Sequence, residues 1–208
     1  MSDIVAAPVR VALTFDAEHP DRAACPQGNI ERILDTLKAT AVRATFFVQG
    51  RWAQSQPVAA KRIAQDGHLV GNHSFYHART PLLSEAGIRE DVRDAEQHIQ
   101  EIIGVNPQPW FRCPFGAGGD DARVLGVLSD LGYRNVGWHV AVQDWEPWRK
   151  APDLVDDVVD GVRTHGDGAV VLLHSWPEGT GDALEQMIGE LRAVGAEFAT
   201  VDQLEMLP

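Results

Sequence analysis

Short apolar runs of strand character recur along the chain, and longer segments with the apolar spacing of helices separate them. The runs lie near residues 9–15, 43–49, 68–72, 109–113, 133–140, 169–174 and 197–201. Strands that alternate with helices are typical of a parallel sheet. Seven strands are enough to curl into an incomplete barrel, and an open doubly wound sheet is the alternative that the pattern leaves open.

The clearest helical pattern follows Ser84, with apolar residues three and four positions apart, as one helix face requires. These are Ile88, Val92, Ala95, Ile99, Ile102 and Ile103. Ser84 is placed to cap the helix and Gly104 to end it. A second stripe runs from 184 to 194, before Gly195, and Pro152 opens a third helix. The chain shows no repeat and no linker, so we expect a single domain over residues 1–208.

Residues that carry chemistry follow four of the strand-like runs. Asp16 follows the first run, His73 and His77 follow the third, Arg112 lies near the end of the fourth, and His174 ends the sixth. In a parallel α/β protein the carboxyl ends of the strands share one face, and catalytic groups collect there. The sequence therefore predicts that these distant residues converge on a metal-assisted hydrolase centre.

The spacing of His73 and His77 favours a shared metal ion. On a helical turn, imidazoles four residues apart would share a face and reach one ion. Asp16, after an apolar strand, is either a turn residue or a general base for hydrolysis. Arg112 lies among aromatic residues, where it could pair with Asp16 and keep that carboxylate ionised.

His174 ends the most apolar run of the chain, so it is either a core histidine or a general acid that protonates a leaving nitrogen. The acid role needs a raised pKa, which a carboxylate such as Asp144 would provide. Trp145 and Trp176 are either core residues or flat apolar walls for a sugar ring.

Composition limits the classes of partner. The net charge of -12 disfavours nucleic acid and anionic membranes. The two cysteines, Cys25 and Cys113, are not clustered and imply no disulfide framework. No signal-peptide pattern and no apolar run of membrane-spanning length occur, so we expect a cytoplasmic protein, or a secreted one if the N-terminus was trimmed.

The order and context of these segments resemble the polysaccharide deacetylase family, also called the NodB homology domain or carbohydrate esterase family 4. The resembling segments are residues 13–16, 44–50, 67–77, 112–116, 144–145 and 172–174. The resemblance implies a distorted, incomplete (β/α)7 barrel of parallel strands. It also implies a divalent metal, usually zinc, and hydrolysis of an N-acetyl or related amide in a saccharide or other small molecule.

The family pattern also implies a role for each matching residue. Asp16 would be the base, His174 the acid, Arg112 and Asp144 their orienting partners, and His73 and His77 metal ligands. A backbone N–H near Phe115 would help to hold the oxyanion of the tetrahedral intermediate.

One position departs from the family pattern. The family usually has two consecutive aspartates in its first motif, and the second is a metal ligand, but Ala17 stands there and cannot ligate. Either Glu18 supplies the third ligand, or the metal site is lost and the protein binds without turnover. Residues 17 and 18 of a strand face opposite ways, so we expect the chain to turn at Asp16. His19 and Asp21 are weaker candidate ligands.

Three functions therefore remain open. They are N-deacetylation of an amino sugar or oligosaccharide, hydrolysis of a small cyclic amide or ureide, and carbohydrate binding without catalysis. The remaining histidines, and Cys113 as a small buried residue, are expected to be structural. These histidines are His68, His98, His139 and His165.

Overall fold

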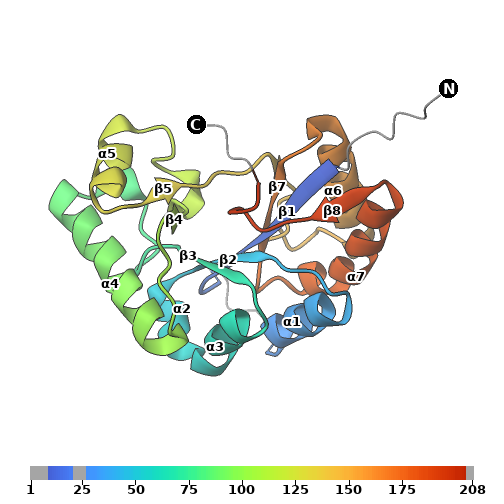
Figure 1. Cartoon of the computed structure of the whole chain (residues 1–208), viewed down its shortest axis with the longest axis horizontal. Helices are drawn as coiled ribbons and strands as arrows, with labels where there is room; N and C mark the ends of the chain where they lie inside the picture. Colours follow the sequence, from blue (N-terminus) through green and yellow to red (C-terminus); the bar gives the residue numbers. More distant parts are fainter. Residues whose placement is uncertain (1–8, 21–26, 205–208) are drawn as a thin grey trace.

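The computed structural model describes residues 9–20 and 27–204, and Figure 1 shows their arrangement. Asp21 and Cys25 lie outside the described residues. The strands are β1 (Val9–Ala17), β2 (Thr45–Val48), β3 (Leu69–Asn72), β4 (Trp110–Phe111), β5 (Arg134–Asn135), β6 (Val140–Ala141), β7 (Ala169–His174) and β8 (Ala196–Phe198). The α-helices are α1 (Asn29–Ala39), α2 (Gly50–Ser55), α3 (Pro57–Gln65), α4 (Glu85–Ile103), α5 (Ala122–Asp130), α6 (Ala151–His165) and α7 (Glu178–Ala193). The 3-10 helices are η1 (Thr80–Leu82) and η2 (Pro114–Gly116).

The strands form one parallel sheet in the order β5-β4-β3-β2-β1-β7-β6, and β8 pairs with β1 beside this path. The sheet curls, and helices α1 to α4, α6 and α7 follow its outer side in an arc (Figure 1). A doubly wound sheet would carry helices on both faces. The expected distorted, incomplete (β/α)7 barrel is thus confirmed, and the doubly wound alternative is wrong.

The single strand predicted over 133–140 is instead two short strands at opposite edges of the sheet. β5 pairs with β4, whereas β6 pairs with β7. Between them, the N–H of Val136 donates to the Phe111 carbonyl and the N–H of His139 donates to the Val170 carbonyl. The segment therefore crosses the open side of the barrel, and its apolar residues pack on the interior rather than along one strand.

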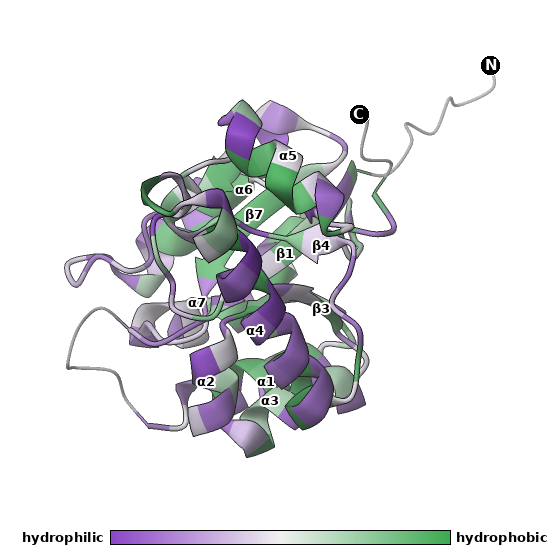
Figure 2. Cartoon of the chain, turned by 90° about the vertical axis from the view of Figure 1, so that its left-hand side faces the viewer, coloured by the Kyte–Doolittle hydropathy of each residue, from purple (hydrophilic) through white to green (hydrophobic). Residues whose placement is uncertain are grey.

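The helix patterns are confirmed. Helix α4 follows Ser84, whose Oγ accepts the N–H of Gly87, and it ends at Gly104 with a φ of 86°. The outer face of α4 is hydrophilic in Figure 2, and its apolar residues are turned to the core. Helix α6 begins at Ala151 with Pro152 in its first turn, and α7 precedes Gly195.

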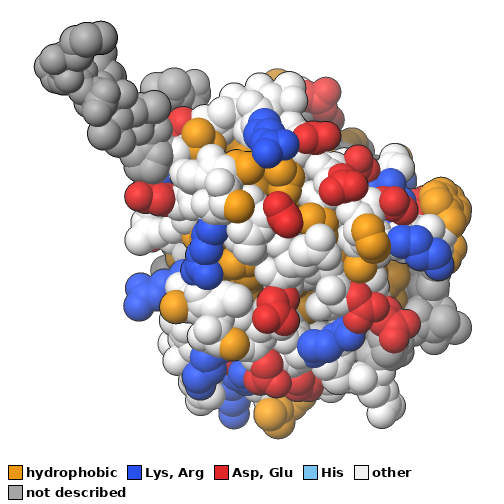
Figure 3. Space-filling view, turned by 90° about the vertical axis from the view of Figure 1, so that its right-hand side faces the viewer, with side chains coloured by type: hydrophobic (Ala, Val, Ile, Leu, Met, Phe, Trp, Pro, Cys, Tyr) orange, Lys and Arg blue, Asp and Glu red, His pale blue; other side chains and the backbone are white. Residues whose placement is uncertain are grey.

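Acidic and basic side chains are interspersed on the face shown in Figure 3. Exposed pairs such as Arg10 with Asp167 contribute little to stability individually, because solvent screens their charges. Within residues 9–20 and 27–204, no helix combines the length and apolar character needed to cross a bilayer.

Side chains of β1 alternate between the two faces of the curled sheet. Val11, Leu13, Phe15 and Ala17 pack into the core between the sheet and the helices, whereas Ala12 joins a second cluster on the inner side. Asp16 lies on the inner side and is the register neighbour of His174 on β7. The parallel register therefore puts a carboxylate and an imidazole side by side at the carboxyl edge of the sheet.

Candidate active site

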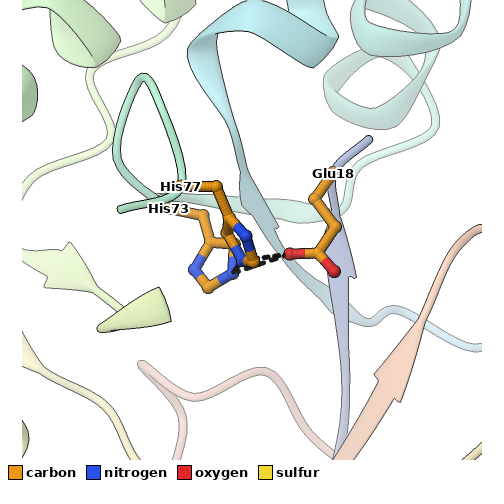
Figure 4. A group of neighbouring side chains, drawn as sticks. All are labelled: Glu18, His73 and His77. Carbon is orange, nitrogen blue, oxygen red and sulfur yellow. Dashed lines mark hydrogen bonds and ion pairs between the residues drawn. The ribbon is translucent and has the colours of Figure 1, made fainter. Parts of the chain in front are cut away.

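Three side chains from two segments form a candidate metal centre at this edge (Figure 4). Ligand atoms of Glu18, His73 and His77 all lie within 4.8 Å of one another. The Nε2 atom of His73 is 3.2 Å from Glu18 Oε2 and 3.2 Å from His77 Nε2, and Glu18 Oε2 also contacts His77 Nε2. Two imidazoles and one carboxylate are a ligand set that suits catalytic zinc.

The surroundings of these three residues fit a bound cation. The Nδ1 atom of His73 lies 2.9 Å from the Arg112 carbonyl, to which it donates, so Nε2 is the ring nitrogen that faces Glu18 and is placed to bind a cation. Burial alone raises the pKa of Glu18, but hydrogen bonds from His73 and His77 outweigh it and hold that pKa far below its usual range. A buried, ionised carboxylate between two imidazole nitrogens is therefore ready to receive a divalent ion.

Glu18 reaches the site by strand alternation and not by a turn. β1 continues through Ala17, whose carbonyl accepts the N–H of Gln49, and Ala17 is fully buried on the helix side. Glu18, two residues after Asp16, lies on the same side as Asp16. The expected turn at Asp16 is therefore wrong, because the strand extends one residue past it.

Glu18 faces the histidines and Ala17 faces the apolar core, so the two positions differ in what a substitution would do. We expect Glu18→Ala to weaken zinc affinity and any zinc-dependent hydrolysis together, measured by chelator competition and rate assays. The double variant Ala17→Asp/Glu18→Ala should not recover either, because an aspartate at position 17 would project into the apolar core. Recovery of zinc affinity in the double variant would show that β1 can change register, and would contradict this arrangement.

The histidine pair converges through a tight loop rather than a helical turn. Ser74 and His77 have positive φ angles of 64° and 60°. Ser74 Oγ accepts the N–H of His77 at 2.9 Å, which closes the loop over residues 74–77. The sequence spacing was informative about proximity, but the backbone path depends on side-chain hydrogen bonds that no periodic pattern reveals.

Asp91 of α4 is a supporting residue that sequence reasoning missed. Its Oδ1 accepts the N–H groups of Phe75 and Tyr76 at 3.2 and 2.8 Å, and its carboxyl is buried. The available signal was an acidic residue on the apolar face of α4, three positions after Ile88. Asp91 thus fixes the loop that presents His77.

We expect Asp91→Ala to weaken zinc affinity about 10–100-fold, as loss of a residue that orients a metal ligand does. Competition with a chromophoric chelator measures this affinity. The neighbouring Glu90→Ala is a matched control, because Glu90 is exposed on the same helix turn. An unchanged zinc affinity in Asp91→Ala would contradict the positioning role.

Arg112 contacts Asp16, as the sequence predicts. Its Nη1 donates to Asp16 Oδ1 at 2.9 Å, and its other nitrogens donate to the carbonyls of Val136 and Gly137. The guanidinium is 1% exposed and lies 4.1 Å from the centre of the Phe47 ring. These hydrogen bonds and the Phe47 ring hold the guanidinium in place. Arg112 therefore holds Oδ1 of Asp16, and Oδ2 faces the site, 3.5 Å from His73 Nε2.

His174 and Asp144 form a second hydrogen-bonded pair. Nδ1 of His174 lies 2.8 Å from Asp144 Oδ1, and Asp144 Oδ2 accepts the backbone N–H of His174 and the hydroxyl of Thr180. Burial by itself lowers the pKa of His174, but Asp144 and the nearby carboxylates raise it to about 9. The ring is therefore an imidazolium at neutral pH, with Nε2 on the side of Glu18. Nothing in the sequence singled out Thr180.

A pocket of about 360 Å³ joins these groups. Its lining consists of Asp16, Glu18, His77, Phe115, Trp138, Trp145, Glu146, Leu172, His174 and Trp176. Trp138, Glu146 and Leu172 were not predicted to line it. The only sequence signal for Trp138 was its aromatic character, in a run that was assigned to one strand.

The three predicted contact residues occupy different parts of this pocket. Phe115 is 45% exposed and its ring centre lies 4.5 Å from that of His77. Trp145 stands edge-on to His174, with ring centres 5.2 Å apart. Trp176 is buried, and its Nε1 donates to Glu18 Oε1 at 3.3 Å, so it supports the metal centre as well as lining the pocket.

His19, His68 and Cys113 are not part of the metal cluster. His19, one of the two weaker candidate ligands, has its Nε2 3.3 Å from both the Arg51 carbonyl and Ser55 Oγ. His68 is buried, and burial lowers its pKa to about 4. Burial raises the pKa of the Cys113 thiol to about 12, which makes it a poor nucleophile.

Comparison with known proteins points to one family. A family model described as polysaccharide deacetylase matches residues 6–136. The peptidoglycan-N-acetylmuramic acid deacetylase PdaA of Bacillus subtilis is 30% identical over 195 residues, covering 93% of this chain and 70% of the relative. A peptidoglycan-N-acetylglucosamine deacetylase of Bacillus cereus is 33% identical over 198 residues, covering 93% of this chain and 67% of the relative.

A solved structure adds a contrasting case. The crystal structure of a CE4 family pseudoenzyme from Bacillus anthracis superposes with a TM-score of 0.84 at 28% identity. The match covers 95% of this chain and 66% of that protein.

Proposed function

The chain belongs to the polysaccharide deacetylase family, a family of hydrolases of C–N bonds, and we propose that it removes the N-acetyl group of an amino sugar in a glycan such as peptidoglycan. The observation that carries this proposal is a complete set of groups around one pocket. Asp16 is held by Arg112, and His174 is held by Asp144. The cluster of Glu18, His73 and His77 lies next to both Asp16 and His174.

Glu18, His73 and His77 would hold the divalent ion, and their chemistry favours zinc. When bound, such an ion supplies Lewis acidity, which polarises a carbonyl and lowers the pKa of water. The names of the peptidoglycan-directed relatives support a glycan over a small cyclic amide as the substrate.

Asp16 acts as the base in this proposal. Its Oδ2, which Arg112 does not hold, faces the pocket and takes a proton from the attacking water as the new C–O bond forms. Arg112 fixes the orientation of the carboxylate, because it donates to the other oxygen. The backbone N–H of Phe115 is the proposed donor to the oxyanion.

His174 acts as the acid. Its Nδ1 is engaged by Asp144, so the proton on Nε2 is the one available to the leaving nitrogen. Transfer of that proton accompanies cleavage of the C–N bond, and the products are the free amine and acetate. Proton exchange with solvent then returns Asp16 to its ionised form and His174 to its protonated form.

The His174–Asp144 pair predicts the alkaline limb of the pH–rate profile. Activity requires protonated His174, whose pKa is about 9, so the rate should fall as pH rises through that value. In Asp144→Asn, burial still lowers the pKa of His174, but the carboxylate that contributes most to raising this pKa is gone. We therefore expect the alkaline limb to move to lower pH, which kcat/KM profiles would measure. Asp182→Asn, an exposed residue of α7 paired with Arg32, should leave the limb in place.

The proposal is tested by acetate release from N-acetylated glycans after loading with zinc, with small cyclic amides in parallel. Zinc-dependent release from a glycan supports it, and hydrolysis of only the cyclic amides contradicts it. A non-catalytic binding domain is the second candidate, which Ala17 and the pseudoenzyme neighbour favour. Saturable glycan binding by fully zinc-loaded protein, with no acetate released, would establish that second function instead.

A further inference from the structure

A second hollow adjoins the active-site pocket. It has a volume of about 320 Å³ and shares His77 and Phe115 with the pocket described above. Its other lining residues are His19, Pro20, Gln49, Arg51 and Tyr76. Because the two hollows share a wall, a saccharide longer than one unit would extend from the reacting position into the second hollow.

The second hollow combines exposed aromatic rings with the guanidinium of Arg51, and Arg79 contacts Phe115 without lining the hollow. Tyr76 is 59% exposed and lies 5.9 Å from the Arg51 guanidinium, and Phe115 lies 4.4 Å from the Arg79 guanidinium. Among the described residues, neither arginine forms an ion pair, although the chain has a net charge of -12. Arginines that keep their charge without a carboxylate partner are available to an anionic ligand.

The active-site pocket has a different character from the second hollow. Its lining includes Asp16, Glu18 and Glu146 but no lysine or arginine. A ligand that fills both hollows would therefore meet an arginine only in the second one, next to Phe115.

We propose that the hollow lined by Arg51, Tyr76 and Phe115 binds a carboxylate that the glycan carries close to the reacting N-acetyl group. The inference rests on the proposed function and narrows its substrate class to acidic glycans. The Arg51 guanidinium donates two hydrogen bonds to the carboxylate, and Tyr76 and Phe115 pack against the apolar face of the sugar. The carboxylate belongs either to the sugar itself or to an attached peptide.

The test compares kcat/KM for zinc-loaded protein on a peptide-free glycan of alternating N-acetylglucosamine and N-acetylmuramic acid, and on its methyl ester. We expect the free carboxylate to be preferred about three- to tenfold, chiefly through KM, with the preference declining as salt is added. A glycan with peptide stems distinguishes the source, because a preference that appears only with stems assigns the carboxylate to the peptide. Equal values for all carboxylated glycans and their esters would overturn the inference.

Variants link the preference to Arg51. Arg51→Gln should abolish the discrimination while hydrolysis of a neutral N-acetylglucosamine oligomer continues, and Arg51→Lys should keep part of it because the charge remains. Arg163→Gln is the matched control, because Arg163 is an exposed arginine that lines neither hollow. It lies in the last turn of α6, which precedes the amino end of β7. Discrimination that survives in Arg51→Gln would overturn the assignment to this residue.

The two proposals can fail separately. Hydrolysis without any carboxylate preference would leave the proposed function standing and remove the acidic subsite. If no glycan is hydrolysed, calorimetric binding of the peptide-free glycan and its methyl ester to the native protein still tests the subsite. Tighter, Arg51-dependent binding of the free carboxylate would then support it, and equal binding would overturn it.

Discussion

Asp16→Asn is expected to lower kcat/KM for deacetylation about 10²–10⁴-fold, the usual cost of losing one proton-transfer group. The amide oxygen of asparagine can still accept the Arg112 hydrogen bond, so the side chain keeps its place. It cannot take a proton from water. Zinc content should remain close to that of the unaltered protein, because Asp16 is not among the three clustered ligand residues.

The substitution also removes a buried negative charge beside Arg112, so stability must be measured with activity. Thermal unfolding shows whether a loss of rate reflects a loss of fold. Asp167→Asn provides a matched control, because it makes the same chemical change in an exposed pair with Arg10 at the other end of β1. A folded, zinc-loaded Asp16→Asn protein with near-normal activity would exclude Asp16 as the base.

The His73→Ala/His77→Ala variant is expected to lose tight zinc binding and, with it, measurable hydrolysis. Two of the three clustered ligand groups disappear, and Glu18 alone cannot hold a divalent ion tightly. Elemental analysis and chelator competition measure the metal, and circular dichroism reports the fold.

A second histidine pair offers the control. His139 and His165 stack with ring centres 3.9 Å apart, away from the metal cluster. His139→Ala/His165→Ala removes the same number of imidazoles and should leave zinc binding intact. If the His73→Ala/His77→Ala protein still binds one equivalent of zinc tightly, the metal centre has been assigned to the wrong residues.

Several features of this protein could be read from its sequence. The alternation of apolar runs and helical stripes predicted the parallel α/β architecture, because burial on both faces of a strand and on one face of a helix leaves different periodicities. The ends of those runs identified Asp16, His73 and His174, because parallel strands present their carboxyl ends together. The contact between Arg112 and Asp16 also followed from a charge placed among apolar neighbours.

The tertiary structure decided features that depend on contacts between distant segments. Whether Glu18 could reach the histidines depended on where β1 ended, and pairing with β2 and β7 extended the strand through the residues before it. The loop that carries His77 depends on Asp91 of α4, and the separation of β5 from β6 depends on two different edge strands. Local periodicity records which residues are buried, but it does not record which backbone N–H meets which distant acceptor. The sequence therefore determined the chemical groups and their strands, and the folded chain determined their directions.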